Sequence, residues 1–257
     1  MARPLADCGV VVLGGSAGVG LESAAQFAGQ GSRIVLLGRN PERGAQACGA
    51  VRDRVPEADV SFIRVDAVDA GDAARAEAEC RERLGAIDVL MCTTGPSEPP
   101  QLLHDIPLES IERRLDELIL PPLHMMKVTL PAMRAQRCGV VVTVCSDAAK
   151  VATPGETLVG AAMGAIMMFC KAAALEVKRE GVRINLLTPS LIEGTPGAAL
   201  IEADPFSAKM FAKAAAQAHL GVPDSSDQAA MAVFLASPAA RRITGQAISI
   251  NGGISVA

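Results

Sequence analysis

Three glycines near the start of the chain have the spacing of a phosphate-binding turn. Gly14, Gly18 and Gly20 follow the apolar run Val10–Leu13 and open a helical segment, Gly20–Gln30. Glycine at such positions lets a strand turn tightly into a helix, and it lets the backbone approach a pyrophosphate whose charge the helix N–H groups stabilise. The alternative is a turn whose glycines only bring the helix close to the strand. The place of the turn, between the first strand and the first helix, favours a dinucleotide site.

The end of the second strand indicates which dinucleotide is bound. An acidic residue there would bind both hydroxyls of the adenosine ribose and select NAD. The chain has Gly38 instead, followed by Arg39, whose planar guanidinium suits a 2′-phosphate. The pattern favours NADP(H) over NAD(H), the alternative for Arg39 being an ordinary solvated arginine. Asp66, after the third strand, is either an acceptor for the adenine amino group or a strand cap.

The elements that must position these residues alternate along the chain. Apolar runs typical of buried strands are separated by segments rich in Ala, Glu, Arg and Leu. This alternation predicts an α/β fold: a single Rossmann-like, doubly wound parallel sheet with helices on both faces, in one dinucleotide-binding domain over residues 1–257. The stretch 191–222 is irregular and is the candidate for a mobile substrate flap. The predicted strands are Val10–Leu13, Arg33–Leu37, Val60–Arg64, Val89–Cys92, Val140–Cys145, Arg183–Leu187 and Ala247–Ile250, and the clearest helices are Gly20–Gln30, Ala70–Leu84 and Leu158–Lys178.

The composition excludes several classes of protein. The net charge is −4 with mixed signs and no basic stretch, which argues against binding to nucleic acid or to a membrane surface. The first residues lack the apolar region of a signal peptide, and the apolar segment Ala161–Cys170 is too short to span a bilayer. Seven cysteines without a C-x-x-C pair, and three histidines without ligand spacing, indicate buried thiols in a reducing cytoplasm and no metal site.

Further motifs stand in a fixed order along the chain: Ile87–Leu90, Val182–Asn185 followed by Pro189, Ala232–Ser237, Ile243–Gln246 and Asn251–Gly253. With the glycine turn and the Asp66 strand end, the chain resembles the short-chain dehydrogenase/reductase family from about Gly9 to Gly253. The resemblance implies a nicotinamide cofactor and a homodimer or homotetramer. The cofactor contacts that it implies are Gly14, Ser16, Ala17, Gly18, Val19, Gly20, Arg39, Asn40, Asp66, Ala67, Thr94, Gly95, Pro189, Ile192 and Thr195.

The catalytic positions of that family are filled differently here. Where the family has an Asn-Asn-Ala-Gly loop, the chain reads Cys92–Gly95, and a helix asparagine that holds a relay water aligns with Leu118. The serine that binds the substrate oxygen is retained as Ser146, whereas Val159 stands at the position of the proton-donating tyrosine and Met163 at that of the lysine. A positioned acid contributes roughly 10²–10⁴ in rate. Since the chain contains no tyrosine at all, we expect that it is not a carbonyl reductase of the usual mechanism.

One reaction suits such a site without a tyrosine. When an activated alkene is reduced, hydride goes to the β-carbon, negative charge collects on a thioester oxygen, and carbon is protonated later. Ser146, Thr93 or Thr94 and backbone amides would stabilise that oxyanion. The stretch Pro189–Gly197 resembles the 2,4-dienoyl-CoA reductase branch of the family, which also replaces the tyrosine but retains the lysine.

Other polar side chains near the site have two interpretations. The tyrosine–lysine spacing of the enoyl-acyl-carrier reductases places Glu156 at their tyrosine; such a glutamate donates a proton if burial raises its pKa, and otherwise faces solvent. Asp147 and Lys150 follow Ser146 and either reach the cleft or form a solvated pair. His124 is expected to pack between helices.

The family resemblance places two helices between subunits. The segment Leu158–Lys178 is apolar almost all round, as expected for a buried interface helix. The helix that carries Leu118 contains Pro121 and Pro122, each of which removes a backbone donor. We expect that helix to be broken at the two prolines.

Three functions follow as alternatives. The first is an NADP(H)-dependent oxidoreductase that reduces an activated alkene, with an apolar or thioester substrate. The second is a catalytically inactive subunit that pairs with an active paralogue, and the third is a non-redox isomerase or cyclase that reuses the pocket. The glycine turn and Arg39 favour the first, whereas the loss of three catalytic side chains favours the others.

Overall fold

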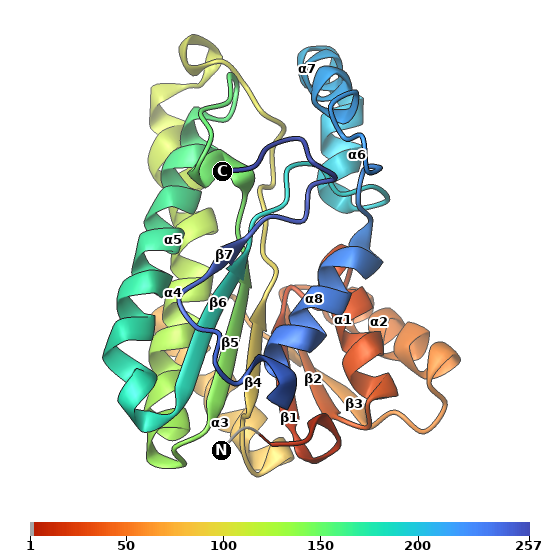
Figure 1. Ribbon diagram of the computed structural model, residues 1–257, viewed down its shortest axis with the longest axis vertical. Coiled ribbons are helices and arrows are strands. Elements are labelled where there is room, and N and C mark those ends of the chain that lie inside the picture. The colour runs from red at the N-terminus through yellow and green to blue at the C-terminus, as the bar shows by residue number, and fades with distance from the viewer. Residues whose placement is uncertain (1–2) are drawn as a thin grey trace.

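The computed structural model describes residues 3–257 and contains one seven-stranded sheet with the order β3-β2-β1-β4-β5-β6-β7, in which every paired neighbour is parallel (Figure 1). The chain winds outward from β1 in one direction and from β4 in the other, so the order of the strands reverses between them. In such sheets a ligand binds at the carboxyl ends of the strands at this reversal. The strands are β1 Gly9–Leu13, β2 Arg33–Gly38, β3 Val60–Arg64, β4 Val89–Cys92, β5 Gly139–Val144, β6 Val182–Leu187 and β7 Ala247–Ile248.

Helices cover both faces of the sheet, as predicted (Figure 1). One face is covered by α1 Gly18–Gly29, α2 Pro41–Arg54 and α8 Ser225–Ala236. The other is covered by α3 Ala70–Leu84, α4 Ile111–Ala135 and α5 Thr157–Val177. The predicted boundaries of β3, β4 and α3 are confirmed without change, whereas β7 ends at Ile248 and not at Ile250.

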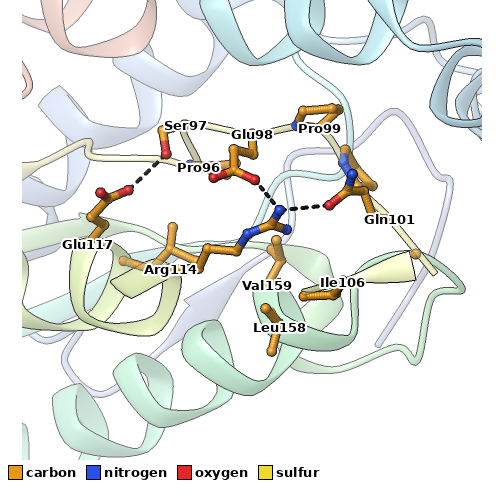
Figure 2. Close-up of a pocket in the computed structure, with 13 residues that line it drawn as sticks. Pro96, Ser97, Glu98, Pro99, Gln101, Ile106, Arg114, Glu117, Leu158 and Val159 are labelled. Carbon is orange, nitrogen blue, oxygen red and sulfur yellow. Dashed lines mark hydrogen bonds and ion pairs between the residues drawn. The ribbon is translucent and has the colours of Figure 1, made fainter. Parts of the chain in front are cut away.

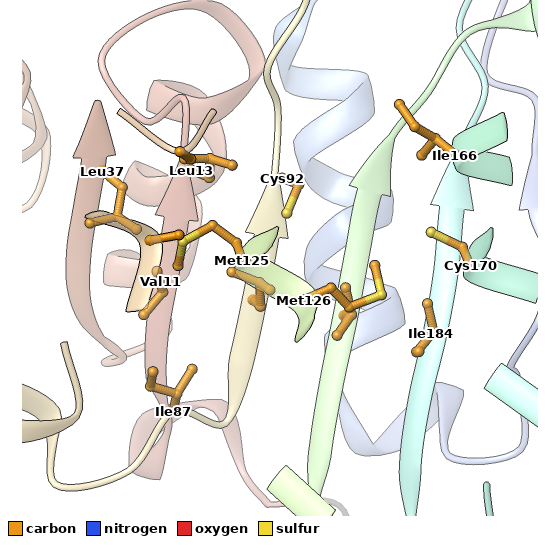
Figure 3. Close-up of a cluster of buried hydrophobic side chains, with 14 of the residues drawn as sticks. Val11, Leu13, Leu37, Ile87, Cys92, Met125, Met126, Ile166, Cys170 and Ile184 are labelled. Atoms are coloured by element: carbon orange, nitrogen blue, oxygen red, sulfur yellow. The ribbon is translucent and has the colours of Figure 1, made fainter. Parts of the chain in front are cut away.

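The core has two halves, because successive side chains of a strand point to opposite faces. On β1, Val11 and Leu13 belong to the cluster under α3, α4 and α5, whereas Val10 and Val12 belong to the cluster under α1 and α8. Figure 3 shows the first cluster, in which methionines of α4 lie over the middle of the sheet. All seven cysteines are buried thiols. Strands covered on both faces are mostly apolar, which explains the continuous hydrophobic runs; the buried polar side chains of β6, Arg183 and Asn185, bind backbone carbonyls.

The prediction of a broken helix at Pro121 and Pro122 is wrong, because α4 continues from Ile111 to Ala135 through both prolines. The two rings leave the carbonyls of Glu117 and Leu118 without their usual intrahelical donors. Both prolines are buried with Met125, Met126 and Met133 against the sheet. Burial of this apolar face compensates for the missing hydrogen bonds, since most helical stability in proteins comes from tertiary packing.

The prediction that residues 191–222 are irregular is also wrong in part. The segment contains α6 Pro196–Ala203 and α7 Pro205–Ala215, which stand above the carboxyl ends of the strands (Figure 1). Thr195 and Asp204 cap these two helices, and each is followed by proline at the first helical position. A capping side chain followed by proline is a helix start signal.

Helix α5 extends beyond the apolar segment Ala161–Cys170 at both ends. Together with the turn that follows it, through Glu180, it is long and apolar enough by composition to cross a membrane. Its inner face packs on the sheet through Ile166, Cys170 and Ala174, as in the core helix of a globular domain. Its outer face exposes Met168 by 63% and Leu175 by 65%. Both faces of α5 therefore carry apolar side chains: the inner face is buried against the sheet, and the outer face is exposed in the single chain.

Candidate active site

The glycine turn has the backbone geometry that the sequence predicts. Gly14 and Gly18 have φ values of +79° and +49°, which favour glycine. A Cβ atom on Gly20 would lie 2.6 Å from Thr93 Oγ1 and closer still to the Gly14 carbonyl oxygen. A side chain at Gly20 would therefore clash, and side chains at Gly14 and Gly18 are disfavoured by the backbone conformation.

The first turn of α1 is left without a side-chain cap. Ala17 occupies the capping position, and no side chain accepts a hydrogen bond from the N–H groups that follow. Side chains cap the helices α2, α3, α6, α7 and α8, whereas α4 and α5, like α1, begin without a side-chain cap. Free N–H groups at the amino end of a helix, next to a turn without side chains, bind phosphate. This end of α1, at the strand reversal, fits the pyrophosphate of a dinucleotide.

Gly38 and Arg39 lie where the second strand ends, and Arg39 is exposed. Asn40 caps α2, with its side chain accepting a hydrogen bond from Arg43 N at 2.9 Å. Arg39 and Asp66 line one cavity of about 380 Å³, which is within the usual range for small-molecule sites. The rest of its lining is mostly charged and consists of Val68, Glu109, Glu112, Arg113, Asp116 and Glu117. Five carboxylates and two arginines give this cavity a negative lining, which sequence reasoning about Arg39 alone missed.

Asp66 and Ala67, just after β3, are held by hydrogen bonds. Asp66 accepts a hydrogen bond from Val68 N at 3.3 Å, and its own N–H donates to Asp72 Oδ2 at 2.7 Å. The carbonyl of Ala67 lies 3.0 Å from His124 Nδ1, so His124 ties α4 to this loop. The interpretation of His124 as a packing residue fits this contact.

One of the predicted contacts at the carboxyl ends of the strands, Thr195, lies against the glycine turn. A Cβ on Gly18 would lie 3.4 Å from Thr195 Cγ2, which brings the start of α6 against the turn. Thr195 Oγ1 donates to the Ile192 carbonyl at 2.9 Å, and the Pro189 carbonyl accepts from Asp147 N at 2.8 Å. Thr94 and Gly95 follow β4 in the loop beside the turn.

Hydrocarbon occupies the place where the family resemblance puts a proton donor. Leu118 of α4 and Val159 of α5 line the same cavity, together with Leu158 and Ile106 (Figure 2). The cavity measures about 30 Å³. A water molecule needs roughly 10–15 Å³ on such a measure, so the space holds water but no organic substrate. Met163 lies outside this lining and is only 3% exposed in the core beside Cys145.

A loop over this cavity is fixed by charged contacts. Arg114 of α4 reaches between Glu98 and Gln101, and binds the Gln101 side-chain oxygen at 2.8 Å and the Glu98 carboxylate (Figure 2). Ser97 donates to Glu117 at 2.8 Å. Ser207 of α7 donates to the Pro100 carbonyl at 2.9 Å. The loop 96–101 therefore joins α4 to α7 across the site, and substrate entry requires it to move.

Ser146 and Thr93 differ in whether their hydroxyl protons are free. Ser146 Oγ accepts from Ala148 N at 3.1 Å, and no residue within 3–257 accepts its proton. Thr93 Oγ1 donates to the Leu13 carbonyl at 2.8 Å, so its proton already binds the end of β1. Of the two hydroxyls, Ser146 is the one able to donate to a substrate oxygen.

Two carboxyl groups that follow Ser146 in the chain, Asp147 and Glu156, each had two interpretations in the sequence. Asp147, in the short turn η4 Asp147–Ala149, is buried, and its Oδ2 accepts from Ser255 Oγ at 2.6 Å and Asn251 Nδ2 at 3.4 Å. Glu156 precedes α5 and is half-buried. Burial, with a smaller effect of the Asp147 charge, raises the pKa of Glu156 from 4.5 to about 7. Asp147 is thus a buried group and not part of a solvated pair. Within residues 3–257, no group of three or more His, Cys, Asp or Glu is placed to hold a metal ion.

Comparison with known proteins identifies the family. Residues 14–255 match the family model described as enoyl-(acyl carrier protein) reductase. The chain is 30% identical to momilactone A synthase of Oryza sativa subsp. japonica, over 99% of this chain and 92% of that protein. It is 31% identical to 2,5-dichloro-2,5-cyclohexadiene-1,4-diol dehydrogenase of Sphingobium indicum, over 100% and 99% of the two chains. The chain belongs to the short-chain dehydrogenase/reductase family and is an oxidoreductase of that family.

Solved structures agree on the fold. A short-chain dehydrogenase/reductase from Mycobacterium ulcerans superimposes with a TM-score of 0.87 at 26% identity, over 95% of this chain and 88% of that one. Levodione reductase gives a TM-score of 0.89 at 23% identity, over 96% and 97% of the chains, which supports the fold alone. Membership of the family implies a nicotinamide dinucleotide cofactor and a small-molecule substrate.

Proposed function

We propose that the protein is an NADP(H)-dependent reductase of activated alkenes, such as enoyl thioesters, and not of ketones. The observation that carries the proposal is the contrast between the uncapped N–H groups of α1 and the hydrocarbon at Leu118 and Val159. The first feature suits a dinucleotide. The second provides no proton for the alkoxide that forms when a ketone is reduced.

The chemistry assigned to each residue follows from its contacts. The nicotinamide cofactor, when bound, supplies the hydride. Ser146, whose hydroxyl proton has no acceptor within residues 3–257, donates to the thioester oxygen and stabilises its developing charge. The apolar lining at Leu118, Leu158 and Val159 accommodates an acyl chain once the loop 96–101 has moved. Residues 191–222, which contact both the glycine turn and this loop, serve as the substrate flap.

NADP(H) is proposed over NAD(H) because Gly38 leaves the ribose hydroxyls without an acidic partner and Arg39 is exposed beside it. The carboxylates that line the same cavity weaken the positive potential at Arg39. We therefore expect only a modest preference for NADP(H) over NAD(H). The remaining contacts are those predicted from the sequence, from Gly14 through Gly20 on one side and from Pro189 through Thr195 on the other.

We also propose that the protein is a cytoplasmic homodimer or homotetramer. Exposed Met168 and Leu175 make the outer face of α5 apolar, and a second copy of the chain would cover it. Seven buried thiols are typical of a reducing compartment.

The test is a titration with NADPH and NADH followed by turnover. The chain contains no Trp and no Tyr, so the emission of the reduced nicotinamide is measured without background from those residues. We expect tighter binding of NADPH, and consumption of NADPH with enoyl thioesters but none with ketones. Absence of binding by either nucleotide would overturn the proposal. Co-purification with a tyrosine-bearing paralogue, without turnover alone, would support an inactive partner subunit instead.

A further inference from the structure

Arg114 is a cation in the wall of the cavity that Leu118 and Val159 also line. It lies on α4 one helical turn before Leu118, so the two side chains are neighbours on one face of that helix. The Arg114 side chain is only 13% exposed. An arginine is rarely buried this far unless it is paired. The group that pairs with Arg114 therefore indicates which chemistry this part of the cavity binds.

The partner of Arg114 is a carboxylate that the chain itself supplies. Glu98, in the loop 96–101, binds Arg114 through Oε2 and Arg113 through Oε1. Arg114 also donates to Gln101 Oε1 of the same loop at 2.8 Å (Figure 2). Its Nε is buried and has no hydrogen-bond partner within residues 3–257. The guanidinium thus holds a carboxylate while one of its buried donors remains unused.

Movement of the loop would separate this pair. The loop 96–101 lines the cavity, so a substrate enters only when the loop moves and takes Glu98 with it. An apolar ligand that filled the open cavity beside Leu118, Leu158 and Val159 would leave Arg114 without water and without an anion. A buried charge that loses its partner is strongly destabilised. A ligand with a carboxylate of its own would replace the lost ion pair.

The other charged groups nearby do not offer this site. Among the described residues that line the cavity, Arg114 is the one cation. Arg113 is 51% exposed and lines the separate cavity that contains Arg39. Glu117 is already bound by Arg113 at 3.0 Å and by Ser97 Oγ at 2.8 Å. An anion that enters the cavity of Val159 would therefore be bound by Arg114.

We propose that the substrate carries a carboxylate, and that Arg114 binds this carboxylate in the place that Glu98 occupies when the loop is closed. The inference rests on the proposed function and deepens it by naming the substrate class: an activated alkene whose acyl part ends in a carboxylate. The planar guanidinium suits this role because it donates two parallel hydrogen bonds to one carboxylate. The unused Nε of Arg114 is available as one of these donors. Glu98 is then an internal competitor of the substrate.

The first experiment measures binding and needs no turnover. The probes are two N-acetylcysteamine thioesters of glutaconic acid, one with its terminal carboxylate free and the other with that carboxylate as the methyl ester. Neither probe carries a phosphate, so the carboxylate is the only anion that differs or contributes. The full-length protein is titrated by calorimetry with and without NADP⁺, which has no hydride to transfer. We expect the free carboxylate to bind about 10-fold more tightly. Equal affinity, or binding of neither probe, would overturn the proposal.

Three variants assign the effect to its residues. R114Q should bind the two probes equally. E98Q lacks the internal competitor and should bind the carboxylate probe more tightly than the unmodified protein does, a gain that a purely structural ion pair would not give. R134Q is the matched control, because Arg134 is an exposed residue near the other end of α4, and it should keep the preference. Circular dichroism checks that each variant is folded.

The E98Q variant leaves Arg114 intact, so it tests the proposal even if R114Q does not fold. Weaker binding of the carboxylate probe by folded E98Q would overturn the proposal. So would an undiminished preference in folded R114Q.

NADPH oxidation with the same two probes separates this inference from the proposed function. Faster oxidation with the free carboxylate, at concentrations below saturation, would support both if R114Q loses the difference. Equal oxidation with both probes would support the proposed function and overturn the carboxylate site. A preference for the carboxylate in a protein that binds neither NADPH nor NADH would support the carboxylate site and overturn the proposed function.

Discussion

The glycine turn at the end of β1 and the cavity between α4 and α5 are constrained in opposite ways. At the end of β1 the backbone controls the structure, since Gly14 and Gly18 have positive φ and α1 begins without a cap. Between α4 and the start of α5 the side chains control it, since Leu118 and Val159 line a cavity that holds little more than water. Under the proposed function, binding of a dinucleotide and donation of a proton are separable properties of this fold.

The largest expected effect concerns the glycine turn at the end of β1. In Gly20→Ala the new methyl group overlaps the Gly14 carbonyl oxygen and Thr93 Oγ1, neither of which is a flexible chain end. Such an overlap costs the folded turn roughly 3 kcal/mol; if the turn shifts to relieve it and the whole cost falls on binding, the affinity for NADPH drops about 100-fold. NADPH titration and a thermal melt measure it. Gly29→Ala on the same helix is the control, because no atom lies within 4 Å of its new Cβ; equal losses in both variants would contradict the role of the turn.

The next prediction concerns the cavity between α4 and α5, and it introduces the tyrosine and lysine that the family resemblance places there. Val159→Tyr combined with Met163→Lys should create ketone reduction at a rate about 100-fold above background, since a positioned acid contributes about that much. The loop 96–101 must open to admit the phenol, and the buried Met163 position makes the lysine costly to stability. An NADPH oxidation assay with ketones, alongside a melt, separates the two effects. If a folded variant that binds NADPH does not reduce ketones, the site lacks more than these two side chains.

A third prediction concerns stability and pH. The folded chain holds the Glu156 proton more tightly than the unfolded chain, with a pKa of about 7 against 4.5. The stabilisation is complete below about pH 4.5 and is lost as the pH rises through about 7. After allowance for partial exposure, the loss is on the order of 2 kcal/mol. Denaturant unfolding from pH 5 to 8 should show that E156Q lacks this loss, and a parallel pH dependence in both proteins would be the contrary result.

The smallest expected effect concerns the choice between NADPH and NADH at the end of β2. A Cβ on Gly38 would meet only ordinary contacts, the nearest being Phe62 at 3.5 Å, so Gly38→Asp should fold normally. Its carboxylate would repel a 2′-phosphate and accept hydrogen bonds from ribose hydroxyls. NADPH should weaken by about 10-fold, or about 1.4 kcal/mol, while NADH binds more tightly. Paired titrations measure the ratio, and an unchanged ratio would place the 2′-phosphate away from Gly38.

Sequence reasoning succeeded where local rules determine the structure. The glycine turn, the alternating strands and α3 follow from spacing and periodicity, and the comparisons confirm the family. It failed at Pro121–Pro122, because burial against the sheet outweighs the missing hydrogen bonds. The start signals of α6 and α7 were present in the sequence but were overlooked.

The candidate site was harder to predict because its contacts are distant in sequence. Asp147 meets Ser255 across 108 residues, and the loop 96–101 meets Ser207 across 107. No spacing rule connects such pairs. The burial of Glu156, and the negative lining around Arg39, are likewise visible only when helices from different parts of the chain are assembled.

The burial of every cysteine has a practical consequence for the study of motion. Burial raises the pKa of the Cys80 and Cys170 thiols to about 12, so alkylating reagents at neutral pH encounter almost no thiolate there. A single cysteine introduced at Leu220, which is 89% exposed in the segment 191–222, would carry a fluorescent or spin label without removal of any native residue. Such a label would test, in the otherwise unaltered protein, whether the proposed flap opens.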